Sequence, residues 1–186
     1  IMKKIITSLM ALSLIFGASA QDGMKGTYLL GATNDITTTG WSDIQIQPNV
    51  GYFVSDNIAV GTTLGFTSTN DKAGTAAGET TTSSTTIAPY VRYYMDSKLF
   101  FTGGFGMINT KSTTVTDGAD DFENKGSQTI IGLGAGLSLM WGERVAVEPA
   151  FVLRNVSGKN EATGSDSMDM PSSLTVGFQI GLSLRM

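Results

Sequence analysis

The stretch Asp43–Thr67, DIQIQPNVGYFVSDNIAVGTTLGFT, decides the fold because apolar residues alternate along it with polar or small ones. The even positions from Ile44 to Val54 are all apolar, and the residues between them up to Gly51 are polar or lack a side chain. Side chains of a β-strand alternate between its two faces, so this period of two predicts a strand with one apolar face. After the short turn Ser55–Asn57 the alternation resumes, which predicts a second strand and a tight hairpin.

Beyond this hairpin, the composition and the N-terminal segment indicate an exported β protein. The chain has 186 residues, of which 41% are hydrophobic and 15% charged, and it contains 23 glycines but 4 prolines. Two lysines, the apolar run Ile5–Gly17 and the small residues Ala18–Ala20 predict a signal peptide over residues 1–20. The run is short for a helix that crosses about 30 Å of hydrocarbon, which favours export over a membrane anchor. We expect residues 21–186 to form the mature domain.

The alternation recurs along the chain and predicts eight strands. Their connections alternate between long and short, which is the pattern of an up-and-down barrel with both termini at the end of the short turns. The predicted strands are Lys25–Thr33, Asp43–Val54, Ile58–Thr67, Thr85–Tyr94, Leu99–Asn109, Thr129–Met140, Val145–Asn155 and Ser172–Met186. The predicted polar loops after the opening hairpin are Ser68–Ser84, Thr110–Ser127 and Val156–Pro171.

The residues opposite the apolar face indicate which side meets the membrane. In Ala59–Thr67 and Gly132–Ser138 they are glycine, alanine, threonine and serine. A face exposed to water needs many charged residues, whereas small residues suit the narrow interior of an eight-stranded barrel. We therefore predict an all-β fold, an eight-stranded antiparallel up-and-down transmembrane β-barrel in the cell outer membrane. The alternative is a secreted, lipocalin-type ligand-binding barrel, whose apolar face lines the interior.

Three prolines fall inside predicted strands. Pro48, Pro89 and Pro149 each remove a backbone donor from the ladder, which is unfavourable in a barrel without edges. We expect each of them to lie at a β-bulge or at a position that the ladder leaves unpaired.

Three segments resemble a known family. Asn57–Gly61, Ala88–Tyr94 and Gly181–Met186 are similar to the hairpin and closing strands of the porin-family outer-membrane β-barrel domain of Gram-negative bacteria. The resemblance covers nearly all of the mature chain and implies contact with outer-membrane lipid. It also implies that the barrel-insertion machinery reads the final strand, which in that family usually ends in an aromatic residue, whereas this chain ends in Met186. The implied insertion signal is Phe178, Ile180, Leu182, Leu184 and Met186.

Few charged residues fall on the predicted inner face. Arg92, Glu148 and Arg185 lie near the short connections, and a charge inside a narrow barrel is costly unless it is paired. We predict that these three form a cluster that plugs the lumen, since eight strands leave little room for a channel. The alternative is a gate or a selectivity ring. The predicted polar network of the lumen is Arg92, Glu148, Arg185, Gln45, Gln47, Asn49, Arg154 and Gln179, with Asp43 as a further inward charge.

The residues that most catalytic and metal sites need are missing from the sequence. The chain has no histidine and no cysteine, and its net charge of −4 disfavours nucleic acid as a partner. The acidic segment Asp117–Glu123, and Asp166 with Asp169, lack the spacing of a calcium loop. We expect no cofactor, no metal and no catalysis. We predict a monomer with a structural or surface-interaction role through four long extracellular loops, with an unidentified partner. The alternative function is a narrow diffusion porin for small solutes.

Overall fold

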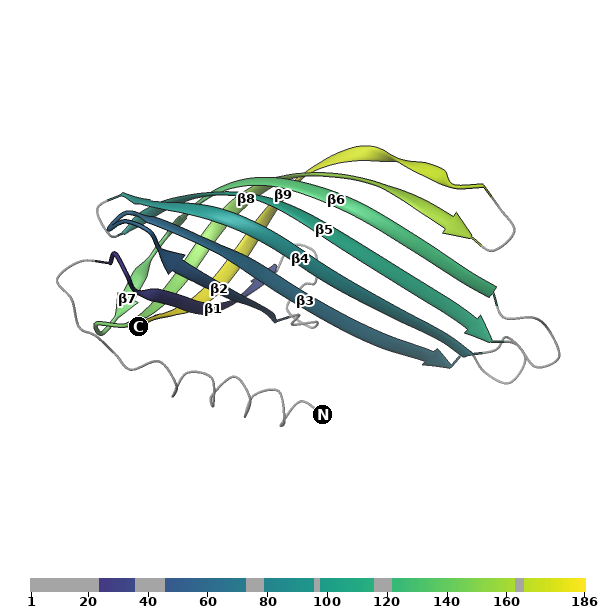
Figure 1. The fold of residues 1–186 in the computed structure, drawn as a ribbon, viewed down its shortest axis with the longest axis horizontal. Helices are drawn as coiled ribbons and strands as arrows, with labels where there is room; N and C mark the ends of the chain where they lie inside the picture. The colour runs from purple at the N-terminus through teal and green to yellow at the C-terminus, as the bar shows by residue number, and fades with distance from the viewer. Residues whose placement is uncertain (1–23, 36–45, 73–78, 96–97, 116–121, 163–165) are drawn as a thin grey trace.

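The computed structural model describes residues 24–35, 46–72, 79–95, 98–115, 122–162 and 166–186 as an all-β protein (Figure 1). The sheet order is β6-β5-β4-β3-β2-β1-β9-β8-β7, and a further pairing between β6 and β8 closes the antiparallel sheet into a barrel. No helix in these ranges is long and apolar enough to cross a membrane. The strands are β1 (Tyr28–Asp35), β2 (Gln47–Phe53), β3 (Ile58–Lys72), β4 (Glu79–Met95), β5 (Leu99–Val115), β6 (Phe122–Leu137), β7 (Leu139–Trp141), β8 (Val145–Ala162) and β9 (Met168–Arg185).

β6 and β7 occupy one position in the barrel wall. Both pair with β8 in one continuous register, and only Ser138 separates them. At this break the amide of Ser138 donates a hydrogen bond to the carbonyl oxygen of Lys98 at 2.5 Å. The strands of the described segments therefore fill eight positions of the wall, and the up-and-down barrel is confirmed. The predicted strand Thr129–Met140 is divided into two pieces.

Three hairpins extend far beyond the predicted strand ends, so the loop predictions for these segments were wrong. β4 and β5 each have 17 residues, and β8 and β9 each have 18. The segments lack apolar alternation, but threonine is β-branched and favours strands, and backbone hydrogen bonds alone continue the ladder. Hydroxyl pairs add to it, as between Thr80 and Thr114 at 3.0 Å. The corrected segments are Ser68–Ser84, Thr110–Ser127 and Val156–Pro171, of which all but residues 73–78, 116–121 and 163–165 are described.

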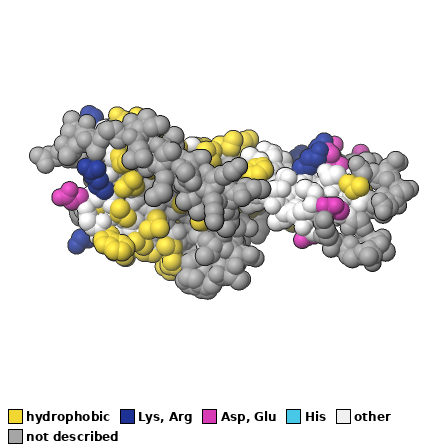
Figure 2. All heavy atoms as spheres, turned by 90° about the horizontal axis from the view of Figure 1, so that it is seen from below, with side chains coloured by type: hydrophobic (Ala, Val, Ile, Leu, Met, Phe, Trp, Pro, Cys, Tyr) yellow, Lys and Arg dark blue, Asp and Glu magenta, His cyan; other side chains and the backbone are white. Residues whose placement is uncertain are grey.

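The apolar face points outward, as predicted. Phe66 is 74% exposed and Leu174 is 66% exposed, although both are large hydrophobic residues. On β9 the outward apolar run from Leu184 to Leu174 rises by about 25 Å, at roughly 3.3 Å per residue and a tilt of about 40°, which equals the apolar band of an outer-membrane barrel. In Figure 2 most hydrophobic side chains lie on the half with the short connections, with charged ones at its rim, and the opposite half shows mainly polar and charged side chains. The barrel wall thus continues beyond the membrane as a polar extension.

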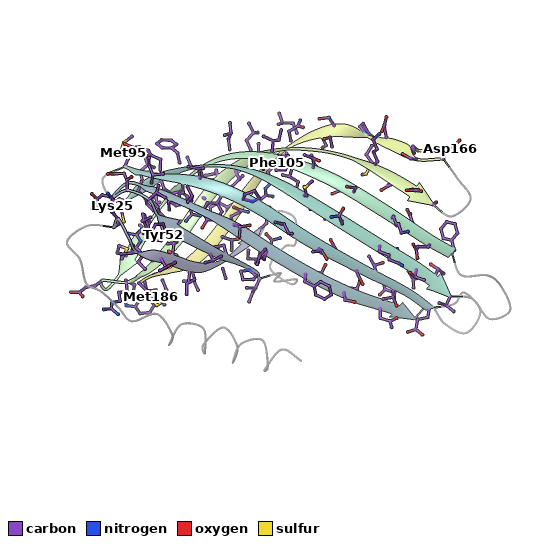
Figure 3. The ribbon with its side chains drawn as sticks, viewed as in Figure 1. Lys25, Tyr52, Met95, Phe105, Asp166 and Met186 are labelled. Carbon is purple, nitrogen blue, oxygen red and sulfur yellow. The ribbon has the colours of Figure 1, made fainter. Side chains whose placement is uncertain are left out.

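The short connections and the described chain ends lie together at one end of the barrel. β2 and β3 are joined by residues 54–57, and β7 and β8 by residues 142–144. The amide of Tyr28 donates to the carbonyl of Met186 at 2.6 Å, which fixes the start of β1 beside the end of β9. Figure 3 shows Lys25, Met95 and Met186 at this end and Asp166 at the far end. By the rule for outer-membrane barrels, the end with the short connections faces the periplasm.

The three mid-strand prolines lie where the ladder is interrupted. Pro89 pairs with β3 but is skipped by the β4–β5 ladder, whose register is the same on both sides. Pro149 pairs with β9 and lies opposite Leu137, where the β6–β8 ladder has stopped next to the break at Ser138. Pro48 pairs with β1 and precedes the β2–β3 ladder, which begins at Asn49. The prolines therefore occupy positions unpaired on one side, and the bulge explanation was wrong, since the register shift lies in the β8–β9 ladder.

Candidate functional site

A cluster of buried charges lies inside the barrel at the periplasmic end. Glu148 of β8 is 4% exposed and Arg92 of β4 is 8% exposed. Nη1 of Arg92 donates a hydrogen bond to Oε2 of Glu148 at 2.6 Å. Nη2 of Arg185, from the end of β9, lies 3.8 Å from Oε1 of the same carboxylate. The structure thus places one carboxylate between two guanidinium groups from three different strands.

Two neutral side chains, which the sequence analysis did not assign to the cluster, complete its hydrogen bonds. The hydroxyl of Tyr94 donates to Oε1 of Glu148 at 3.1 Å and accepts a hydrogen bond from Nη1 of Arg92 at 3.1 Å. Oγ of Ser138 donates to Oε1 at 3.2 Å and accepts from Nη2 of Arg185 at 2.7 Å. A buried carboxylate is stable only with such partners. The signal for Tyr94 was its position two residues after Arg92, on the same strand face.

Aromatic rings fill the space around the charges. The ring of Tyr94 lies between those of Phe53 and Phe100, at centroid distances of 5.4 and 5.7 Å. The guanidinium of Arg92 lies 4.5 Å from the centroid of Phe100, and that of Arg185 lies 4.9 Å from the centroid of Tyr94. Two guanidinium groups and one carboxylate leave a formal charge of +1, which aromatic faces attract. We name Arg92, Glu148, Arg185, Tyr94, Ser138, Phe53 and Phe100 the plug cluster.

Phe53 and Phe100 were missed because they are apolar residues on the face predicted to be polar. Phe53 is fully buried and Phe100 is 1% exposed, and both belong to the small hydrophobic core of the described residues. Gly136 of β6 makes room for the second ring, since a Cβ atom there would lie 2.5 Å from Cζ of Phe100 and 2.6 Å from the carbonyl oxygen of Pro149. The signal was a break in the alternation next to a short connection.

Beside the plug cluster, the barrel contains a cavity of about 430 Å³ that is lined by both polar and apolar residues. Arg154 forms an ion pair in it with Asp35 of β1, which the sequence analysis omitted because its first strand ended two residues earlier. Arg92 also lines the cavity, so the cavity ends on the plug cluster. Gln45 and Asp43 lie outside the described residues. The other predicted luminal residues that line it are Gln47, Asn49 and Gln179.

Four residues of the implied insertion signal lie on the outward face of β9, and Met186 follows the end of this strand. Leu182 is 57% exposed, and the ring of Phe178 packs on that of Phe151 at a centroid distance of 5.1 Å. Phe178 is thus anchored to β8, whereas Leu182 is free to contact lipid. The remaining members are Ile180, Leu184 and Met186.

Charged residues also gather on the polar extension. Glu123 of β6 lies 2.6 Å from Nζ of Lys111 and 2.7 Å from Nζ of Lys125. The hydrogen bond from Lys111, followed by that from Lys125, holds the pKa of the Glu123 carboxyl below its usual value. In turn, the hydrogen bond to Glu123 raises the pKa of Lys125. Asp166 and Asp169 are exposed, and residues 116–121 are outside the described ranges. No group of three or more His, Cys, Asp or Glu side chains suited to a metal ion occurs in the described part of the chain.

The closed antiparallel wall, the outward apolar band and the polar lumen define a transmembrane β-barrel. Residues 7–184 match the family described as the outer membrane protein beta-barrel domain, and the chain belongs to this family of Gram-negative outer-membrane proteins. The protein is accordingly located in the outer membrane.

Three solved structures match most of this chain at low sequence identity. The N-terminal β-barrel domain of OprF from Pseudomonas aeruginosa is 10% identical, with 89% of this chain and 100% of that chain covered and a TM-score of 0.47. Outer membrane protein AlkL is 17% identical, with coverages of 91% and 92% and a TM-score of 0.46. CarO from Acinetobacter baumannii is 9% identical, with coverages of 88% and 99% and a TM-score of 0.44. No curated protein sequence gives a significant match.

Proposed function

We propose that this chain is a closed, non-catalytic outer-membrane barrel whose polar extension acts as a structural element of the cell surface. The observation that carries this proposal is the plug cluster. Glu148 contacts side chains from three other positions of the wall. These are β4, Ser138 at the break between β6 and β7, and β9. A carboxylate held from several sides, with aromatic rings packed on both of its guanidinium partners, blocks a continuous water path at the periplasmic end in this proposal.

The rival function is a narrow diffusion porin. The cavity of about 430 Å³ gives it some support, because Gln47, Asn49 and Arg154 are among the residues that line it. A porin also needs an exit, and the cavity ends on Arg92, which is hydrogen-bonded to Glu148 and Tyr94. Opening this end requires breaking a buried ion pair, which is energetically unfavourable. We therefore favour the closed barrel.

Conductance in planar lipid bilayers tests the proposal. The purified barrel is expected to give no steady open-channel current. Arg92→Ser/Glu148→Ser, which removes one charge of each sign, is expected to give measurable current steps because it empties the centre of the plug cluster. The matched control, Glu143→Gln/Arg144→Gln, removes the same charges at exposed positions of the same end and is expected to remain closed. A steady current from the unmodified barrel would establish the porin instead.

The surface role is assigned to the polar extension. The residues of β3 from Thr67 to Asp71 are exposed on both faces, so their side chains are available to the medium. In this proposal the projecting surface consists of rigid hairpins as well as the loops between them. The proposal further includes export through residues 1–20, assembly read from the final strand, and a monomeric barrel. Deletion of one hairpin tip at a time, scored for binding of cells or matrix, identifies the surface that engages a partner.

A further inference from the structure

A polar groove lies on the outer face of the barrel wall, immediately beyond the apolar band. Its volume is about 540 Å³, and it crosses β4, β5, β6 and β8. Ser83, Lys111, Lys125 and Glu161 are successive cross-strand partners in one row, and Thr85, Asn109, Ser127 and Lys159 are successive partners in the next. All eight line the groove. On each strand they are an even number of residues away from exposed apolar residues nearer the membrane, so their side chains lie on the same face of the strand. This places the groove on the outside of the barrel.

The lysines of this groove are held in place but keep free donors. Lys111 and Lys125 are direct cross-strand partners, an arrangement that is repulsive unless an anion lies between them. Glu123 supplies this anion, with one carboxylate oxygen on each ammonium group. Their side chains are still 55% and 62% exposed, so each ammonium group has N–H donors directed to the medium.

Lys159 adds a third cation to the groove. Its ion pair with Asp169 is long, 3.4 Å, and the two side chains are 69% and 81% exposed, so this pair is weak. Three lysines and Glu161 give the groove lining a formal charge of +2. Glu123 and Asp169 stand beside the groove, and they balance the lysines at long range. Attraction for an anion therefore arises from the local arrangement of ammonium donors.

The groove is at the height of the lipid head groups. Ile87 and Met107 are cross-strand partners on the same outer face, 54% and 52% exposed. They lie four residues closer to the membrane than the row that contains Lys111. At roughly 3.3 Å per residue and a tilt of about 40°, this places the row about 10 Å above them along the barrel axis. Lysine stems bend toward the membrane while their charge stays in the polar layer. An apolar surface that continues directly into a cationic groove fits an amphiphile with an acidic head group.

We infer that this groove binds the phosphate-bearing head group of an acidic glycolipid in the outer leaflet. Lys111, Lys125 and Lys159 donate charge-assisted hydrogen bonds to the phosphate oxygens. The hydroxyl and amide side chains of Thr85 and Asn109 face the sugar hydroxyl groups, and the acyl chains run along Ile87 and Met107. Glu123 positions two of the lysines and does not touch the lipid.

The test compares phosphorylated and dephosphorylated lipid. The full barrel is placed in phosphatidylcholine nanodiscs containing a small fraction of bisphosphorylated diglucosamine lipid or of the same lipid without phosphates, and retained lipid is counted by native mass spectrometry. The expected result is at least a tenfold preference for the phosphorylated form. Lys111→Gln/Lys125→Gln/Lys159→Gln is expected to abolish the preference, and the corresponding Lys→Arg triple variant to keep it.

Controls separate this site from general charge attraction. Lys25→Gln/Lys98→Gln/Arg144→Gln removes three exposed cations at the periplasmic end and is expected to leave the preference unchanged. An equal loss in this control variant would overturn the inference, as would an unmodified barrel without preference. Displacement of the lipid by millimolar inorganic phosphate would show that the groove recognises the anion alone and would refute a lipid site. None of these outcomes depends on whether the barrel conducts.

Discussion

Replacing Glu148 with glutamine is the most direct test of how much the plug cluster stabilises the barrel. The substitution keeps the size and shape of the side chain and removes its charge. In the folded protein the carboxylate accepts hydrogen bonds from Arg92 at 2.6 Å, from Tyr94 at 3.1 Å and from Ser138 at 3.2 Å. The formal charge of the plug cluster rises from +1 to +2, and an amide N–H group is turned toward groups that are themselves donors.

Breaking a buried ion pair by removing one partner costs about 3–5 kcal/mol, because the remaining charge is buried without compensation. Since each 1.4 kcal/mol is a tenfold change, Glu148→Gln is expected to shift the folding equilibrium by roughly 10²- to 4 × 10³-fold toward the unfolded state. Replacing all three charges together, as Arg92→Met/Glu148→Leu/Arg185→Met, removes the unpaired charges as well. This variant is expected to lose much less, because apolar groups of similar volume often substitute for a buried ion network without loss.

The assay is equilibrium unfolding in urea of the barrel folded into phosphatidylcholine vesicles. Tryptophan fluorescence reports the transition, since Trp141 is 79% exposed on the outer face of the wall and senses loss of lipid contact. Glu143→Gln, at an exposed position of the same end, is expected to change the free energy of unfolding by less than about 0.5 kcal/mol. A loss below 1 kcal/mol for Glu148→Gln, or a triple variant as unstable as the single one, would refute this account of the cluster.

Two further predictions concern close packing and the polar extension. Gly136→Ala places a Cβ atom 2.5 Å from the ring it packs against and is expected to cost about 1–3 kcal/mol, whereas Gly103→Ala, with its nearest contact at 3.5 Å, is expected to be nearly neutral in the same urea assay. The carboxyl carbon shift of Glu123 in NMR is expected to titrate below the usual range of glutamate, and Lys111→Gln/Lys125→Gln to raise the midpoint. Because the folded pKa is lowered, the stabilisation of this hairpin is present above the unfolded pKa and is lost as the pH falls through the folded value.

The barrel was predictable from the sequence because apolar residues alternate with polar or small ones along its membrane-spanning strands. Ile58, Val60 and Leu64 specify a face, and the glycines and threonines between them specify which face is inside. The polar extension was not predictable in this way, since Thr80–Thr86 carries no apolar alternation and its pairing depends on backbone hydrogen bonds and hydroxyl contacts. A pattern-based reading finds strands that bury one face and misses strands that bury neither.

Only the charged residues of the plug cluster were predictable from the sequence. The inner face of the predicted barrel holds Arg92, Glu148 and Arg185, and all three lie close to the short connections. Their positions in the alternation were therefore sufficient to group them. Parity does not report how far a side chain reaches across a lumen, so the aromatic neighbours and the hydroxyl of Ser138 were not found. Asp35 was missed for a simpler reason, an early end to the first predicted strand.

The membrane-spanning part of the wall and the polar extension are stabilised by different means. Substitutions in the two parts are therefore expected to have different effects. Inside the membrane, Glu148 and Arg92 each depend on identified partners, so a change at either position leaves a buried charge uncompensated. On the extension, residues 67–69 of β3 are exposed on both faces, so their replacement is expected to cost little side-chain packing. The ladder that holds them uses backbone groups, which every residue except proline supplies. Substitutions on the extension are therefore expected to cost less stability than substitutions in the plug cluster.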